Sequence, residues 1–417
     1  MDPIVVIGAG AAGIMAARRA AELGSAVLLL EKTPRLGTKI LISGGGKCYI
    51  THDGPIEDVL RAFRPREARF IRPACYRFTN KQIVSLLTER GLQVYTRPDG
   101  RIFPVDQTAK DVVAILRRCL DEVGVRIRFD APVSAIRRDE KGICGVDFAG
   151  GCQASRRVVL AVGGSSYPNS GTTGDGFGWA TSLGHTVVPI RAALAPIRLA
   201  DEMWRQYSGV ALRDCLLKAR QNQREIARWR GDTLFTHLGL SGPCTLEISR
   251  EVSEALERGA VELETDLLPD QSFEAATFSI LDYGKQYPAR TIKRYLGEAI
   301  VPERLIDEIL KSSRVPDETI FSKLQRGGRS RLIENLKGWK LGNVAEVILD
   351  KGEVVAGGVS LDEVDPKTMC SLKCPGLYLC GEVLDIAGPV GGYNLQAAFA
   401  TGYIAGETAH NDQAVRV

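Results

Sequence analysis

The sequence predicts an α/β protein in which a three-layer domain built on a parallel sheet is interrupted by an inserted module. Residues 4–7 form a continuous apolar strand that runs into a glycine-rich turn and an alanine-rich helix. Buried-type strands return near the end of the chain, at residues 376–380. Between these regions, from about residue 189, the chain changes to short alternating strands and then to helices. The chain therefore leaves the sheet domain and comes back to it.

Composition bounds the protein class. The 417 residues exceed one ordinary core, and 44% hydrophobic with 25% charged residues excludes global disorder. The net charge is only +4, which gives no argument for a polyanionic partner. No apolar run reaches the roughly 20 residues of a membrane span, and no secretory leader precedes the first strand, so we expect a cytoplasmic protein. The ten cysteines are scattered without any C-x-x-C pair, so no metal is expected.

The first motif predicts a dinucleotide-binding unit. The strand at 4–7 leads into Gly8-Ala9-Gly10-Ala11-Ala12-Gly13 and a helix through residue 21. In this pattern Gly8 makes the tight turn, Gly10 lets a pyrophosphate approach the backbone, and Gly13 lets helix and strand pack closely. The helix N-terminus adds unpaired amides and a positive dipole end.

A second strand, residues 26–30, ends in Glu31, 18 positions beyond Gly13. An acid at that strand end can accept hydrogen bonds from both hydroxyls of an unphosphorylated adenosine ribose. This unit alone does not separate FAD from NAD.

Later segments favour FAD. Residues 37–48 bring three consecutive glycines between Lys39 and Lys47, a loop that suits a longer phosphate and sugar chain. Residues 158–164 form another strand that ends in small residues. The strand at 376–380 is followed by Asp385 and by a helical stretch at 395–408, whose N-terminal amides can face the pyrimidine edge of a flavin.

An ordered set of longer motifs is more specific: GGGKC (44–48), GRIFP (100–104), VGGSSYPNSGTTGDG (162–176), LFTHLGLSGP (234–243) and GEVLD with GGYNLQAA (381–398). With these motifs the chain resembles the BaiN/YhiN-type bacterial flavoproteins, aminoacetone-oxidase-like FAD-binding enzymes. The resemblance covers nearly the whole chain. It implies cofactor contacts from Gly8, Gly10, Gly13, Glu31, Lys39, Ser43, Gly44, Gly45, Gly46, Lys47, Cys48, Gly163, Gly381, Asp385, Gly392, Tyr393 and Asn394.

Neighbouring positions in the same motifs complete the predicted FAD site: Ala12, Lys32, Val133 as the residue that meets adenine, Ala161, Gly164 and Glu382. The chain departs from the family pattern at Lys47, Tyr49, His52 and Cys370. Lysine does not reproduce a planar guanidinium, so the departure at Lys47 bears on the substrate.

The predicted organisation is a discontinuous Rossmann-like FAD domain of residues 1–188 and 350–417, a β-barrel-like insert of 189–270, and a helical insert of 271–349. The predicted function is an FAD-dependent oxidoreductase that transfers a hydride between bound flavin and a small organic substrate. The resemblance points to two chemistries, oxidation of amino-ketones and reduction of enone-type double bonds, and the sequence does not choose between them. Only one dinucleotide fingerprint is present, so NAD(P)H is expected at most as a transient reductant.

The catalytic groups beyond flavin stay open, with His237 and Lys47 as weak candidates. Two other function classes are compatible with the sequence. One is an RNA-associated flavoprotein that uses the six arginines between Arg61 and Arg77, although a solvated helix face is the commoner reason for such a cluster. The other is a flavin-binding protein without turnover. A small-molecule substrate is favoured over nucleic acid, and no membrane partner is expected.

Overall fold

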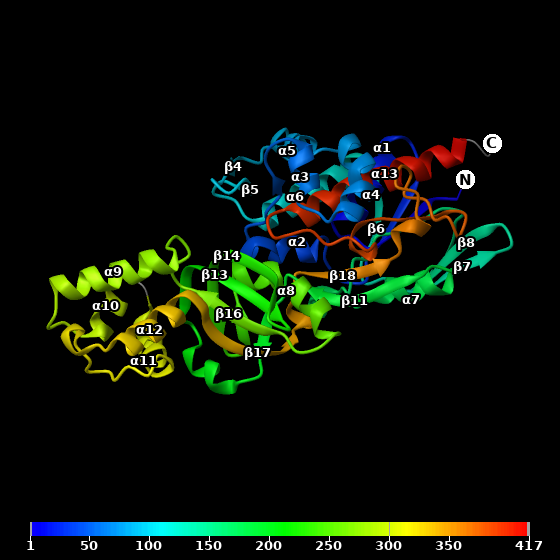
Figure 1. Cartoon of the computed structure of the whole chain (residues 1–417). Coiled ribbons are helices and arrows are strands. Elements are labelled where there is room, and N and C mark those ends of the chain that lie inside the picture. Colours follow the sequence, from blue (N-terminus) through cyan, green and yellow to red (C-terminus); the bar gives the residue numbers. More distant parts are fainter. Residues whose placement is uncertain (1, 300, 415–417) are drawn as a thin grey trace. The chain divides into compact units, whose positions relative to one another are not determined.

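We describe a computed structural model of the chain, which covers residues 2–299 and 301–414. The chain divides into two compact units, Met1–Ile190 with Val354–Val417 and Arg191–Glu353. Each unit is described by itself, and Figure 1 gives the element labels.

The first unit is built on a parallel sheet with strand order β19-β10-β1-β2-β6. Its central strands are buried along their whole length because they are covered on both faces, as the apolar runs predict. The register places Ile7 beside both Leu30 and Leu160, so neighbouring strands end together at one edge. The strands are β1 (Ile4–Ile7), β2 (Val27–Leu30), β6 (Arg126–Arg128), β10 (Val158–Leu160) and β19 (Leu377–Leu379).

Smaller sheets flank this one, in the orders β3-β5-β4, β7-β8-β9 and β11-β18. Their strands are β3 (Thr51–His52), β4 (Val94–Thr96), β5 (Arg101–Pro104), β7 (Val133–Asp139), β8 (Gly142–Phe148), β9 (Gly151–Ala154), β11 (Val187–Ala193) and β18 (Val354–Val359). The helices of the unit are α1 (Ala11–Glu22), α2 (Thr38–Ile42), α3 (Ile56–Arg61), α4 (Pro65–Arg77), α5 (Asn80–Thr88), α6 (Ala109–Glu122), α7 (Asp175–Ser182) and α13 (Tyr393–Ala414).

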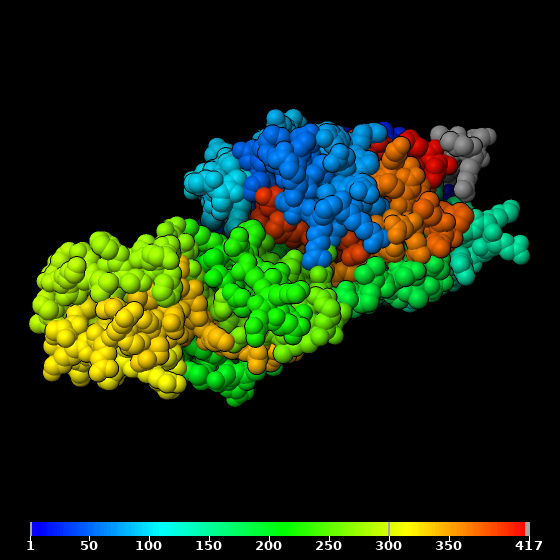
Figure 2. All heavy atoms as spheres, viewed as in Figure 1, coloured from blue at the N-terminus to red at the C-terminus, as the bar shows by residue number. Residues whose placement is uncertain are grey.

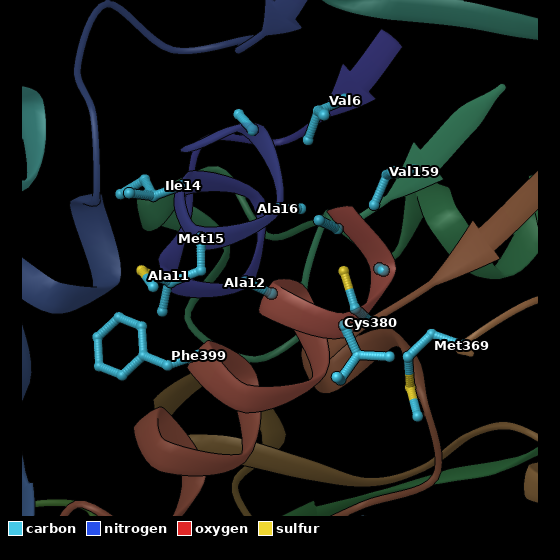
Figure 3. Close-up of a cluster of buried hydrophobic side chains, with 14 of the residues drawn as sticks. Val6, Ala11, Ala12, Ile14, Met15, Ala16, Val159, Met369, Cys380 and Phe399 are labelled. Carbon is cyan, nitrogen blue, oxygen red and sulfur yellow. The ribbon is translucent and has the colours of Figure 1, made fainter. Parts of the chain in front are cut away.

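The first and last helices of the unit lie side by side in backbone contact (Figure 1). A Cβ atom on Gly402 of α13 would lie 2.1 Å from the carbonyl oxygen of Ala12, and one on Gly406 would lie 2.1 Å from that of Ala16. Figure 3 shows the surrounding core, in which small side chains of α1 meet Cys380 and Phe399 from the C-terminal segment. Only glycine at both α13 positions allows so close an approach.

The second unit contains a closed barrel with strand order β12-β15-β14-β13-β16-β17. Its strands are β12 (Ile197–Leu199), β13 (Ala211–Gln221), β14 (Arg224–Thr236), β15 (Gly239–Ser241), β16 (Glu262–Asp266) and β17 (Trp339–Val347). The helices are α8 (Pro243–Leu256), α9 (Phe273–Gln286), α10 (Ile292–Ala299), α11 (Glu303–Ser312) and α12 (Arg326–Gly338). The parallel-sheet domain with an inserted barrel confirms the predicted fold class.

The barrel and the helices share one hydrophobic core, and the strand β17 lies inside the range 271–349 that was predicted to be helical. The prediction of helix to residue 349 is wrong for this stretch. Trp339, Leu341 and Val344 are buried between exposed neighbours, and β17 pairs with both β12 and β16 to close the barrel.

In the described residues, no helix is long and apolar enough to cross a membrane, and no cluster of three or more His, Cys, Asp or Glu side chains could hold a metal ion. All ten cysteines are free thiols.

The first unit is interrupted between Ile190 and Val354, and the chain on the two sides of this interruption lies close together. The amide of Glu353 donates a hydrogen bond of 3.0 Å to the carbonyl of Leu194, next to the paired strands β11 and β18. We predict that replacing residues 195–352 by a short Asn-Gly hairpin gives a folded first unit that still binds FAD. Circular dichroism and flavin retention on a gel-filtration column check this. An unfolded product would contradict the predicted independence of the unit.

The α1–α13 contact predicts an inverted glycine effect. Helix propensity alone favours alanine over glycine by about 1 kcal/mol, and the exposed Gly178 on α7 has open space around its Cβ direction. We expect Gly178→Ala to raise the midpoint of thermal unfolding slightly. Gly402→Ala should lower the midpoint, because its methyl group would collide with the backbone of Ala12. We expect the free energy of unfolding to fall by about 1–3 kcal/mol. Equal stabilisation by both substitutions would show that the helices separate freely.

Candidate functional site

The glycine turn has the geometry that the sequence predicts for two of its three glycines. Gly8 has a φ of 95°, and a Cβ there would lie 2.6 Å from the carbonyl oxygen of Ala161. A Cβ on Gly13 would lie 1.8 Å from the carbonyl oxygen of Gly8. Both glycines are therefore required by the protein's own packing.

Gly10 differs, and it serves as a test of whether a cofactor fits. Its φ of −82° and ψ of −171° suit any residue, and no protein atom lies within 4 Å of its Cβ direction. The protein itself thus gives no reason for glycine. Gly10 is the N-cap of the twelve-residue helix α1, whose first turn has no side-chain cap and no acidic residue. Open space beside uncapped amides fits an approaching pyrophosphate.

Glu31 lies directly after β2 and faces the same turn. Its Oε2 accepts a hydrogen bond of 2.8 Å from the amide of Ala9, and its Oε1 accepts from the amide and hydroxyl of Thr33. An ionised carboxylate has about four acceptor positions, so these bonds orient it and leave capacity for a ribose hydroxyl. Val133, the predicted adenine neighbour, is the half-buried first residue of β7.

An ion pair joins distant segments at the same edge of the sheet. Lys39 Nζ lies 2.7 Å from Glu382 Oε2, and Glu382 Oε1 accepts from the amide of Val355 at 3.0 Å. Gly163 and Gly164, which follow β10, lie against the same carboxylate: Cβ atoms there would be 3.6 Å and 3.0 Å from its oxygens. Four predicted positions, from three parts of the chain, are thus neighbours.

Lys32 is held by a different partner. Its Nζ lies 2.7 Å from Asp175 Oδ2 at the start of α7. Burial raises the pKa of Asp175, but the hydrogen bonds from Lys32 and Thr173 outweigh it and hold the pKa below its usual range. The Lys32 charge is therefore matched by a carboxylate.

The loop from Ser43 to Cys48 is tightly wound. Gly44, Gly45 and Gly46 have φ values of 59°, 66° and 87°, which side chains rarely adopt. The Ser43 hydroxyl donates to the carbonyl of Ile40, and Cys48 is buried, which raises its thiol pKa to about 12. Lys47 is exposed.

The C-terminal segment returns to the glycine turn. A Cβ on Gly381 would lie 2.8 Å from that of Ala12, and the Gly381 amide donates to the hydroxyl of Thr401. Asp385 Oδ1 accepts a hydrogen bond of 3.0 Å from the amide of Gly357. The structure therefore brings residues 8–13 and 381–385 together, as two motifs of one site require.

Asn394 closes its own loop. Its side-chain amide accepts from the amide of Gly388 at 2.8 Å and donates to the carbonyl of the same residue at 2.9 Å. Its neighbour Gly392 is packed against Thr51, where a Cβ would lie 2.6 Å from the carbonyl carbon. These contacts fix the start of α13, so the backbone there is the feature that can face a ligand.

An aromatic and cationic group adjoins this loop. The rings of His52 and Tyr393 stack with centroids 4.5 Å apart, and the Arg101 guanidinium lies 5.8 Å from the ring centre of Tyr49. A Cβ on Gly391 would lie 3.3 Å from Arg101 Nε. Two positions that depart from the family pattern, Tyr49 and His52, therefore lie beside the predicted flavin loops.

His237 belongs elsewhere. It is exposed in the turn between β14 and β15 of the second unit, where Thr236 makes the side-chain hydrogen bonds that hold the turn. Four residues outside the predicted site hold its members in place by hydrogen bonds: Ser166, Val355, Gly357 and Thr401. Thr401 lies next to the glycine pair of α13, whose spacing of four residues is a signal of close helix packing.

Known proteins are similar to this chain over nearly its whole length. The family model described as HI0933-like protein Rossmann domain matches residues 2–408. A protein of Haemophilus influenzae named ribosomal RNA dihydrouridine synthase is 30% identical over 410 residues, 96% of this chain and 96% of that protein. A protein of Clostridium scindens named 3-dehydro-bile acid delta(4,6)-reductase is 31% identical over 412 residues, 98% of this chain and 99% of that protein.

A solved structure of 3-ketosteroid delta1-dehydrogenase from Sterolibacterium denitrificans, in complex with 1,4-androstadiene-3,17-dione, is similar with a TM-score of 0.54. It is 15% identical and covers 99% of both chains, so the likeness shows the fold alone.

The open space at Gly10 gives a sharp test of the cofactor site. We predict that Gly10→Ala folds normally but binds FAD at least about tenfold more weakly, because its methyl group occupies the approach of the pyrophosphate. Gly338→Ala is the matched control, since that glycine also has no atom within 4 Å and lies in the other unit. Flavin fluorescence titration measures both. Unchanged affinity in Gly10→Ala would refute the assignment of the turn.

Proposed function

This chain belongs to the HI0933-like family of FAD-dependent oxidoreductases, and from that premise we propose that it reduces a carbon–carbon double bond conjugated to a carbonyl group. The observation that carries the proposal is that relatives with two different substrates, each matching over nearly the whole chain, have names that describe this one type of bond.

The chemical argument is simple. Dihydrouridine differs from uridine by two hydrogens across a ring double bond that is conjugated to a carbonyl. A 3-dehydro-bile acid with delta(4,6) unsaturation likewise carries double bonds conjugated to its ketone. In both, the substrate gains a hydride at the β-carbon and a proton at the α-carbon. This common step favours the enone-type chemistry over amine oxidation, for which no relative named above gives support.

The residues at the site would hold FAD as follows. The uncapped amides of α1 and the space at Gly10 suit the pyrophosphate, and Glu31 suits the adenosine ribose. Asp385 and the backbone at the start of α13 suit the flavin half. When bound, FAD supplies the hydride chemistry, and the protein supplies binding and orientation.

The side chains that line these loops would recognise the substrate carbonyl. Arg101 is a permanent cation whose side chain is 24% exposed and whose Nε lies 3.5 Å from Asp99 Oδ2. His52, its neighbour across the paired strands, stacks on Tyr393. A guanidinium near a carbonyl oxygen stabilises the negative charge that develops there when a hydride arrives at the β-carbon. The flat rings of Tyr49 and Tyr393 suit a planar conjugated substrate.

We therefore expect the purified protein to release FAD on denaturation and to be reduced without oxygen by NADH or NADPH. Mixing the reduced protein with cyclohexenone or with uridine-containing RNA should return the flavin absorbance near its oxidised level. Cyclohexanone, which lacks the double bond, is the matched control and should leave the protein reduced. A protein that no conjugated acceptor reoxidises, but that aminoacetone reduces, would assign it to amine oxidation.

A further inference from the structure

We infer that the exposed arginine face of α4 is a binding surface for the backbone of single-stranded RNA that enters the flavin site. The inference rests on the proposed function for the reaction, since a uracil ring in RNA is one carrier of the conjugated double bond. The surface itself follows from the placement of α4 within the first unit.

The arginines of α4 share one side of the helix. Phe70, Ile71, Ala74 and Cys75 are buried, and Arg66, Arg69, Arg72, Tyr76 and Arg77 fall on the opposite, exposed arc. Arg61, the last residue of α3, is also exposed. In Figure 2, residues of α3 and α4, in blue, form a broad part of the surface that faces the viewer.

The charges are only partly neutralised. Arg61 pairs with Asp58, Arg66 with Asp362, and Arg77 with Glu407. Within the described part of the chain, neither Arg69 nor Arg72 has a carboxylate at ion-pair distance. Glu57, the acid that influences Arg72, is itself held by the Tyr76 hydroxyl at 2.8 Å. The middle of the face therefore keeps two unmatched cations.

The face also begins at the site. The ring of Phe63, just before α4, lies 6.4 Å from that of Tyr393, and a Cβ on Gly388 would lie 2.6 Å from the Phe63 ring. At the other end Phe78 stacks on Tyr403, and Arg77 pairs with Glu407. The helices α4 and α13 thus run parallel, and the arginines lead away from the loop at 388–394.

The arginines and the tyrosine of this face are side chains that bind phosphates and stack on bases. A row of guanidinium groups over a helix about 20 Å long matches the repeated phosphates of a few nucleotides. Tyr76 is 49% exposed between Arg72 and Arg77 and offers a ring for base stacking. A nucleotide beyond the start of α4 would then lie beside the loop at 388–394, where an unpaired base can turn toward the flavin loops.

The test uses the whole FAD-loaded protein and a fluorescent, uridine-rich single-stranded RNA oligonucleotide. The variant Arg69→Gln with Arg72→Gln removes the two unmatched charges. The variant Arg126→Gln with Arg138→Gln is the matched control for net charge, because both arginines are exposed and neither has an ion pair with a carboxylate of residues 2–299 or 301–414. Fluorescence anisotropy over a range of salt concentrations gives the affinity and its salt dependence.

We expect the α4 variant to bind RNA more weakly and to reduce the slope of log affinity against log salt by about 1.4, from two phosphate contacts at roughly 0.7 each. The control variant should keep the slope of the original protein. An unchanged slope in the α4 variant, or an equal decrease of the slope in the control variant, would contradict the proposed RNA-binding surface. So would binding of polyglutamate or anionic lipid vesicles, but not RNA, through the same arginines.

The experiments distinguish a failure of the RNA-binding surface from a failure of the proposed double-bond reduction. The α4 variant should keep the reoxidation by cyclohexenone, because Arg69 and Arg72 lie outside the flavin loops, and it should lose activity on RNA through a higher KM. If no conjugated acceptor reoxidises the original protein while the RNA slope still depends on Arg69 and Arg72, the surface stands and the proposed reaction does not.

Discussion

The backbone contact between α1 and α13 is the constraint on which the site depends. Gly402 and Gly406 bring α13 so close that any side chain there would meet the carbonyl oxygens of Ala12 and Ala16. Because both partners are backbone, neither a rotamer change nor a flexible side chain can relieve an error. The contact therefore fixes where the last helix begins relative to the first turn of the chain.

That fixed relation brings the two ends of the candidate site together, although Ala12 and Gly381 are 369 positions apart in the chain. Gly381 lies against Ala12, and its amide is bonded to Thr401 of the same α13. Lys39 and Glu382 then tie the second loop to the C-terminal segment, with Val355 bonded to the same carboxylate. Each contact lies at the carboxyl edge of the parallel sheet, where such sheets bind ligands.

The sequence predicted the features that depend on local rules. The strand, the turn at Gly8 and the acid at Glu31 follow from a motif within one βαβ unit, and the return near residue 381 follows from apolar patterning. The strand β17 was missed because its three buried residues follow directly after the helix α12, and a short alternation there is easily read as the helix's end. The use of Asn394 to close its own loop was missed because it depends on the fold of 388–394. The four-residue spacing of Gly402 and Gly406 is visible in the sequence, but the backbone atoms that they contact are set by the fold.

Two lysines near the glycine turn are already neutralised by ion pairs, so another group must attract the phosphates of an anionic cofactor. Lys32 faces Asp175, and Lys39 faces Glu382, so each of these cations already has a carboxylate within 2.7 Å. The first turn of α1, by contrast, has unbonded amides, no acidic side chain and open space beside Gly10. Its dipole end and amides then supply positive potential beside the turn that no carboxylate side chain of that first turn offsets. An interaction of that kind depends on direction, so it is strong only while α1 is held in place, and α13 holds it.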